Sequence, residues 1–195
     1  MKIRIRCRVS AGVLMLAYVY LIFAVAFRFI APVLGSRANA SLFSFTPILA
    51  ALLYFGYKQP RARVWAPVLL FAAGDLALSK LVYGYPISAD LLFTWAFYAG
   101  AVLLGSLLKD KLSIARVAGA SLAGSIAFFL VSNFAVWAVW QMYPKTLAGL
   151  GACYVAALPF FRNAVAGDLV WSALLFGLPV LIAQSASQTE KVRAR

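Results

Sequence analysis

Basic residues divide this chain into long apolar stretches, and this pattern constrains its fold more than any other feature. Thirteen of its 18 Lys and Arg residues fall in four short clusters, and the chain between clusters is almost continuously apolar. Because Lys and Arg resist translocation, such clusters mark the cytoplasmic loops of proteins that cross a membrane several times. The pattern predicts two hydrophobic passes between successive clusters, and therefore an even number of spans with both termini in the cytoplasm. The clusters are Lys2/Arg4/Arg6/Arg8, Lys58/Arg61/Arg63, Lys109/Lys111/Arg116 and Lys191/Arg193/Arg195.

The composition agrees with a membrane protein. The chain is 65% hydrophobic and 12% charged, whereas ordinary soluble domains are about half apolar and about a quarter charged. Its 195 residues allow one compact bundle, so we expect a single transmembrane domain over residues 1–195. The net charge of +13 does not indicate nucleic acid, because the charges flank apolar spans and form no separate basic domain. We expect them to meet anionic membrane lipids instead.

The apolar stretches predict an all-α integral membrane protein with a bundle of six transmembrane helices. A spanning helix needs about 20 residues, so the second and fourth spans are short. A further apolar segment, 146–161, ends near Pro159, and a seventh span there would move the C-terminal cluster outside. We therefore expect 146–161 to form a re-entrant or interfacial segment on the outer side. The six predicted spans are 11–31, 42–57, 64–82, 91–108, 113–140 and 167–184.

The first span has an alternative interpretation, and several spans carry a small-residue pattern that bears on packing. The basic N-terminus, its apolar run and the sequence Ala24-Val25-Ala26 also fit a cleaved signal peptide, which would leave five spans. Small residues recur at four-residue spacing, as in Ala101/Gly105. Such spacing lets helix backbones approach closely, so we expect these residues at contacts within the bundle, with a dimer contact as the less favoured alternative.

The polar side chains argue against catalysis by this chain alone. It contains no His, and its five acidic residues are scattered, so the commonest general base and metal ligand is missing. No Gly-x-x-x-x-Gly-Lys-Ser/Thr motif is present, so any ATP-driven step would need another chain. We predict no enzyme, no metal site and no cofactor. A membrane enzyme remains the less favoured alternative.

One acidic residue is the first candidate for function. Asp75 lies deep in the third predicted span, and an ionisable group at that depth is costly and by default a functional hypothesis. The alternative is a structural role for Asp75, either in a pair or as a protonated acid hydrogen-bonded to a neighbouring helix. Asp168 fits a helix cap at the start of the sixth predicted span. Lys80, five positions after Asp75, lies on another helical face and is not an automatic partner.

A second group of candidates lies toward the outer ends of the spans. Asn133 and Trp137 share one face of the fifth span, and Tyr143 and Lys145 follow it. An aromatic belt at the lipid headgroups is the alternative for the aromatic residues. We expect Asp75 to accept a donor or balance a cation, and Trp137 and Tyr143 to stack on a ring. Lys145 and Arg162 would meet a carboxylate or phosphate. The predicted substrate-binding residues are Asp75, Asn133, Trp137, Tyr143, Lys145, Arg162 and Asn163.

Several stretches resemble an uncharacterised family of bacterial membrane transport proteins over about residues 40–180. The stretches are 45–48 (Phe-Thr-Pro-Ile), 132–137 (Ser-Asn-Phe-Ala-Val-Trp), 143–150 (Tyr-Pro-Lys-Thr-Leu-Ala-Gly-Leu), 158–163 (Leu-Pro-Phe-Phe-Arg-Asn) and 167–168 (Gly-Asp). That family is in turn similar to the substrate-binding S components of energy-coupling factor (ECF) vitamin transporters.

The resemblance implies six spans, a ligand site near the outer face, and partnership with a transmembrane coupling subunit and two ATPases. The Ala-x-x-x-Ala motif that S components often carry in the first span is absent, because Ala17, Ala24 and Ala26 are followed four residues later by Leu21, Arg28 and Ile30. A chain that works alone or with a dedicated partner therefore remains open.

We expect binding and uptake of a small, vitamin-like metabolite across the bacterial cytoplasmic (inner) membrane. The alternative from another class is a non-transporting membrane scaffold or assembly protein. Gene neighbourhood discriminates between them, because genes for ATPases and a coupling subunit favour transport, whereas cell-wall genes favour a scaffold.

Overall fold

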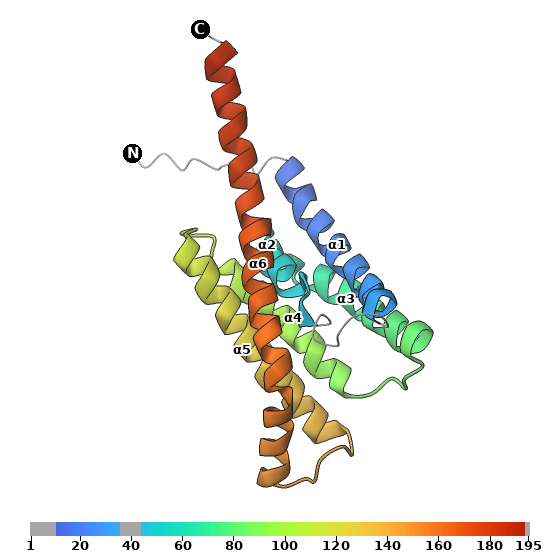
Figure 1. Ribbon diagram of the computed structural model, residues 1–195. Helices are drawn as coiled ribbons and strands as arrows, with labels where there is room; N and C mark the ends of the chain where they lie inside the picture. The colour runs from blue at the N-terminus through green and yellow to red at the C-terminus, as the bar shows by residue number, and fades with distance from the viewer. Residues whose placement is uncertain (1–10, 36–43, 194–195) are drawn as a thin grey trace.

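The computed structural model describes the backbone of residues 11–35 and 44–193, and the side chains of residues 15–30 and 44–180. The N-terminal basic cluster, Cys7 and Arg37 lie outside the described residues, as do the side chains of the C-terminal cluster. Within the described backbone every regular element is a helix (Figure 1). The elements are α1 (Ala11–Gly35), α2 (Ile48–Lys58), η2 (Arg61–Arg63), α3 (Trp65–Ala77), η3 (Leu78–Tyr83), α4 (Asp90–Ser106), α5 (Ile114–Val139) and α6 (Leu147–Arg193).

Three helical segments among the described residues are long and apolar enough to cross a membrane. They are Arg61–Tyr83, Ile114–Val139 and Leu147–Val180. Three further apolar helices, Met15–Ile30, Ile48–Lys58 and Asp90–Ser106, are shorter than the roughly 20 residues that a bilayer requires. The all-helical class predicted from the sequence is therefore confirmed for the described residues, and three of their helical segments have the length and apolar composition of membrane spans.

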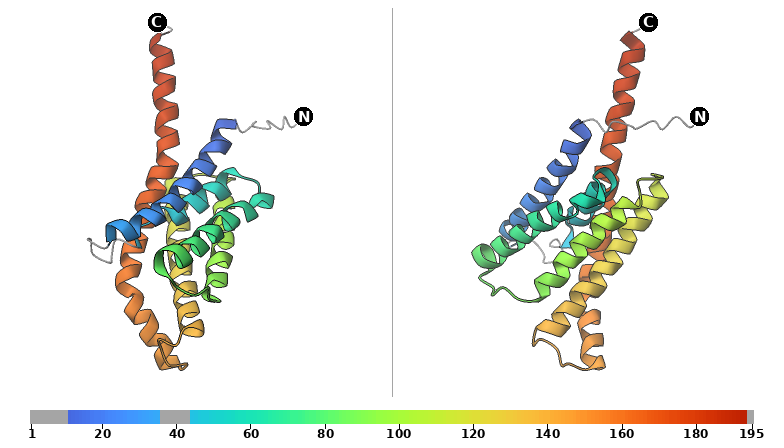
Figure 2. Two further views of the ribbon diagram at one scale, coloured as in Figure 1. Left: turned by 90° about the vertical axis from the view of Figure 1, so that its right-hand side faces the viewer. Right: turned by 180° about the vertical axis from the view of Figure 1, so that it is seen from behind.

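The two internal basic clusters lie at the same end of the molecule. Arg61 Nε donates a hydrogen bond to Ser106 Oγ at 2.9 Å, and the Lys109 ammonium donates to the carbonyl of Gln59. Burial, together with the nearby charge of Arg61, lowers the pKa of Lys109. The start of α1 and the C-terminal end of α6 point toward this end too, whereas the α3–α4 and α5–α6 loops lie at the opposite end (Figure 2). We call these the basic end and the opposite end.

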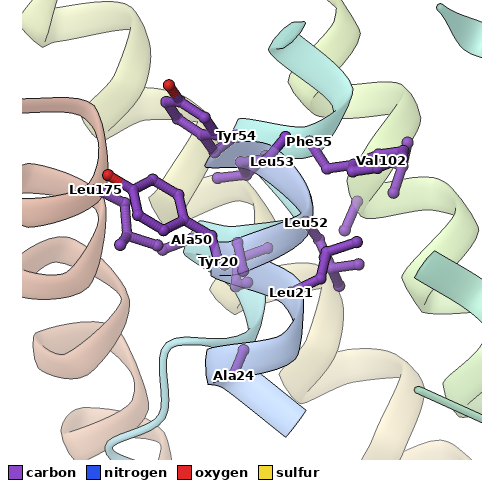
Figure 3. Close-up of a cluster of buried hydrophobic side chains, with 14 of the residues drawn as sticks. Tyr20, Leu21, Ala24, Ala50, Leu52, Leu53, Tyr54, Phe55, Val102 and Leu175 are labelled. Atoms are coloured by element: carbon purple, nitrogen blue, oxygen red, sulfur yellow. The ribbon is translucent and has the colours of Figure 1, made fainter. Parts of the chain in front are cut away.

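The core is built around α2. Every residue from Leu49 to Gly56 is buried, as expected for a helix that is apolar on all sides and enclosed by others. Figure 3 shows Tyr20 and Leu21 of α1, Val102 of α4 and Leu175 of α6 gathered around it. This short helix thus joins elements from both halves of the chain.

Glycines bring the backbones of α2 and α4 into direct contact. A Cβ atom added to Gly56 would lie 2.0 Å from the Val102 carbonyl oxygen, and one added to Gly105 would lie 2.2 Å from that of Leu53. Both glycines are therefore needed for the close approach. The predicted role of the Ala101/Gly105 pair in packing within the bundle is confirmed, since Ala101 is also buried in the core.

The prediction of a separate segment over 146–161 is wrong. The structure has one continuous helix, α6, from Leu147 to Arg193, with Pro159 and Pro179 inside it. The sequence predicts a boundary at Pro159 because proline removes a helical hydrogen bond and clashes with the preceding turn. Neighbouring helices can accommodate that defect in an apolar bundle, and α6 bends in its lower, orange part where it packs on α5 (Figure 2). Helix α6 begins about 20 residues before the predicted sixth span, 167–184.

Candidate ligand-binding cavity

A cavity of about 550 Å³ lies in the half of the bundle near the opposite end. Its wall includes the later parts of α1, α3 and α5, the first parts of α2 and α4, and the segment 157–168 of α6. The residues that precede α2, Ser44 and Thr46, line it too. Since ligand pockets in proteins typically enclose ~300–1,000 Å³, its size suits a small molecule.

Asp75 sits at one side of this cavity and is paired. Arg28 of α1 forms an ion pair with it, and the Asp75 side chain is only 2% exposed. Trp95 Nε1 donates to Asp75 Oδ2 at 3.1 Å, and the Tyr98 hydroxyl lies 3.4 Å from Oδ1 and 3.2 Å from Arg28 Nη1. The carboxylate thus has a counter-charge and aromatic donors, which is how a buried charge becomes tolerable.

Aromatic rings form much of the remaining wall. Phe97 of α4 meets Phe128 of α5, with ring centroids 4.9 Å apart. Phe129 of α5 meets Phe161 of α6, with centroids 4.6 Å apart. All four rings line the cavity, so a ligand there would find apolar surface that also attracts cations through its π electrons.

A row of hydroxyls on α5 leads to a second acid, Asp168. The Ser125 hydroxyl lies 2.7 Å from Asp168 Oδ2 and 2.9 Å from the carbonyl of Ser121. Ser121 in turn lies 2.7 Å from the hydroxyl of Ser172. Asp168 lines the cavity and is 8% exposed. The interpretation of Asp168 as a helix cap is wrong, because α6 begins at Leu147 and Asp168 lies in its interior.

A third acid, Asp90, reaches the cavity from the first turn of α4. A carboxylate is favourable at a helix N-terminus, which accounts for its position. Its Oδ1 atom is nevertheless fully buried and has no hydrogen-bond partner among the described residues. Such an unsatisfied buried oxygen is uncommon and calls for an explanation.

Two of the seven predicted site residues, Asp75 and Asn133, line this cavity. Asn133 Nδ2 donates to the Phe129 carbonyl at 2.7 Å, which leaves its amide oxygen and a second N–H for a ligand. The structure therefore brings together the deep acid and the amide that the sequence placed on different helices.

Trp137 lies in the last turn of α5, whereas Tyr143 and Lys145 lie in the loop between α5 and α6. None of the three lines the cavity. Trp137 Nε1 donates to the Pro144 carbonyl at 2.9 Å. The Lys145 ammonium donates to the carbonyls of Trp137 and Trp140, the latter at 2.7 Å. The two Lys145 bonds satisfy carbonyls that have no partner within the helix at the C-terminal end of α5. Arg162 is exposed on α6 and Asn163 is half-buried, and neither lines the cavity.

Sequence reasoning missed three charged residues of the cavity wall. Arg28 is not among the predicted site residues, and its partner Asp75 is 47 residues away in the sequence. From the sequence, Asp168 is predicted to be a helix cap, and Asp90 has no predicted functional role. The one available signal was that three of the chain's five acids occur within or beside apolar runs, where an ionisable side chain is expensive.

Comparison with known proteins assigns the chain to a family without assigning a role. A family model described as "Family of unknown function (DUF6580)" matches residues 9–190. No curated protein matches the chain, and no solved structure does.

Proposed function

We propose that this chain, which belongs to the family of unknown function DUF6580, binds a small, vitamin-like metabolite from outside the cell for uptake. It would act as an ECF S-component-like protein of the bacterial inner membrane, with six spans and both termini in the cytoplasm. The observation that carries this proposal is the cavity of about 550 Å³, which is walled by charged, polar and aromatic side chains and lies away from the basic loops.

The proposed orientation follows from the basic end. Lys58 to Arg63 and Lys109 to Arg116 lie together there, and positively charged loops remain on the cytoplasmic side. The cavity would then face outward, as a receptor for external substrate requires. The three shorter apolar helices would cross where the bilayer adapts to them or where neighbours cover their ends.

Cysteine labelling tests this orientation. In a Cys7→Ser, Cys153→Ser background, a membrane-impermeant maleimide added to intact cells should modify Gln141→Cys and spare Lys111→Cys. Both positions are exposed, in the α5–α6 loop and the α4–α5 loop respectively. Labelling at Lys111→Cys without permeabilisation would show that the basic end faces outward.

Ligand binding is tested with a variant that fills the cavity. Ala157 lines the cavity, whereas its neighbour Ala156 is exposed and does not, so Ala157→Trp and Ala156→Trp make a matched pair on α6. Gently purified protein would be examined by native mass spectrometry for a co-purified molecule. A panel of vitamins, nucleosides and amines would be screened by thermal shift.

We expect a ligand in the parent and in Ala156→Trp, and its loss in Ala157→Trp. If no co-purified molecule and no stabilising compound is found, or if both variants bind like the parent, the proposed function is wrong. Energy for uptake would come from a coupling subunit and ATPases supplied by other chains. Cells expressing the chain with and without those partners would show whether it works alone.

A further inference from the structure

The charges that the described residues bring to the cavity do not balance. Charged side chains reach its wall from four helices: Arg28 from α1, Asp75 from α3, Asp90 from α4 and Asp168 from α6. Arg28 and Asp75 form the single ion pair among the side chains of residues 15–30 and 44–180, so their charges cancel. The lining residues that come from α2, from the segment before α2 and from α5 are uncharged. Within the described part of the chain, two carboxyl groups are therefore left without a positive partner.

Asp168 is the more enclosed of the two. It is 8% exposed and lines the cavity, and among the side chains that the structure describes its one donor is the Ser125 hydroxyl. That hydroxyl has a single proton, which it shares with the carbonyl of Ser121. Burying a carboxylate is costly unless a positive group or several donors accompany it, and the described part of the chain supplies neither to Asp168.

Asp90 gives a second, independent indication. Its Oδ1 is buried and unpartnered within the described residues, although Asp90 lies on a different helix from Asp168. A single hydroxyl or a single cation in the cavity could satisfy such an oxygen. The aromatic pairs Phe97/Phe128 and Phe129/Phe161 provide the other half of a site for organic cations, because ring faces attract positive charge.

An organic cation fits this arrangement better than a metal ion. No three His, Cys, Asp or Glu side chains in the described ranges lie close enough together to hold a metal. We propose that the cavity binds an organic cation, a protonated amine or quaternary ammonium attached to an aromatic or apolar body. Its charge would be met by Asp168 and Asp90 and its body by the phenylalanine rings. This inference rests on the proposed function, because it specifies the substrate class of the same site.

Three probes with the same ring and similar length but different charge test the inference. They are phenethylammonium, neutral 2-phenylethanol and anionic 3-phenylpropanoate, titrated at neutral pH and up to millimolar concentration against purified protein. We expect phenethylammonium to bind about ten-fold or more tightly than the alcohol, as for a hydrogen bond to a charged group. The anion should bind more weakly than the alcohol.

Charge-neutral variants locate the effect. Asp168→Asn keeps an oxygen that can accept from Ser125. Asp90→Asn changes a carboxylate whose Oδ1 has no hydrogen-bond partner among the described residues, so both variants should fold. Each should reduce the preference for the cation several-fold and leave binding of the alcohol unchanged. Asp110→Asn is the matched control, because Asp110 is exposed in the α4–α5 loop and carries the same charge; it should change nothing.

The Ala157→Trp variant separates this inference from the proposed function. If all three probes bind equally and Ala157→Trp abolishes their binding, the cavity is a ligand site but its preference for cations is refuted. Tighter binding of the anion refutes it as well. If Ala157→Trp and Ala156→Trp bind the probes like the parent, or phenethylammonium does not bind at millimolar concentration, the cation inference fails. In that case the proposed function stands if another compound of the panel binds to the parent, and it is wrong if none does.

Discussion

The contact between α2 and α4 makes a sharp prediction for Gly105→Ala. The new Cβ would lie 2.2 Å from the Leu53 carbonyl oxygen and 2.7 Å from the Leu53 Cα, whereas carbon atoms pack comfortably at about 3.5–4.0 Å. The two helices would have to separate by roughly 1 Å. Overpacking of this kind costs ~1–3 kcal/mol, and about 1 kcal/mol shifts the Tm of a chain this long by ~2–4 °C. We expect Gly105→Ala to lower Tm by ~2–12 °C.

Gly100→Ala is the control, because a Cβ at Gly100 of the same helix meets nothing within 4 Å. Replacing a helical glycine by alanine stabilises a helix by roughly 0.5–1 kcal/mol, so its Tm should stay equal or rise. The assay is intrinsic fluorescence during heating in one detergent, with the parent alongside. Equal Tm values for the two variants would refute the backbone contact between α2 and α4.

Two further variants test the ion pair and the turn. Asp75→Asn should lower stability by up to ~3 kcal/mol, because Arg28 loses its counter-charge; breaking a buried pair costs about 3–5 kcal/mol, and Arg28 is a quarter exposed. An unchanged Tm in thermal unfolding would mean that the pair contributes nothing. Thr146→Ala removes the hydroxyl that accepts from the Gly149 N–H at 3.1 Å, and loss of such a cap costs ~1 kcal/mol. Thr146→Ser keeps the hydroxyl, so it should melt with the parent; equal losses in both variants would contradict the cap.

The sequence predicted best those helices whose first and last residues are marked by local start and stop signals. The fifth predicted helix, 113–140, compares with the observed Ile114–Val139, and Ser113 caps it by accepting from the Arg116 N–H at 3.3 Å. Apolar length and basic flanks are local properties, so they can be read from the sequence. The join between 146–161 and 167–184 was missed because Pro159 is a local signal to stop, which packing against α5 overrides.

The cavity was only partly predictable for a related reason. Asp75 stood out because an acid within an apolar span is conspicuous by itself. Its partner Arg28 was missed because the choice among distant cations depends on how α1 and α3 pack. Trp137 and Lys145 have residue types that suit a ligand, but the same donors also suit the turn that they hold closed. Residue type alone cannot decide between these uses.

The burial of α2 has a consequence for the order in which the protein assembles. This helix has eleven residues, too few to cross a bilayer unaided, and its partners α4 and α6 lie later in the chain. The ribosome finishes α4 about 50 residues after α2, which at ~5–20 residues per second takes roughly 2–10 s. During that interval α2 has only α1 to cover it. In the proposed six-span arrangement, the insertion machinery would therefore hold the first hairpin until its later neighbours arrive.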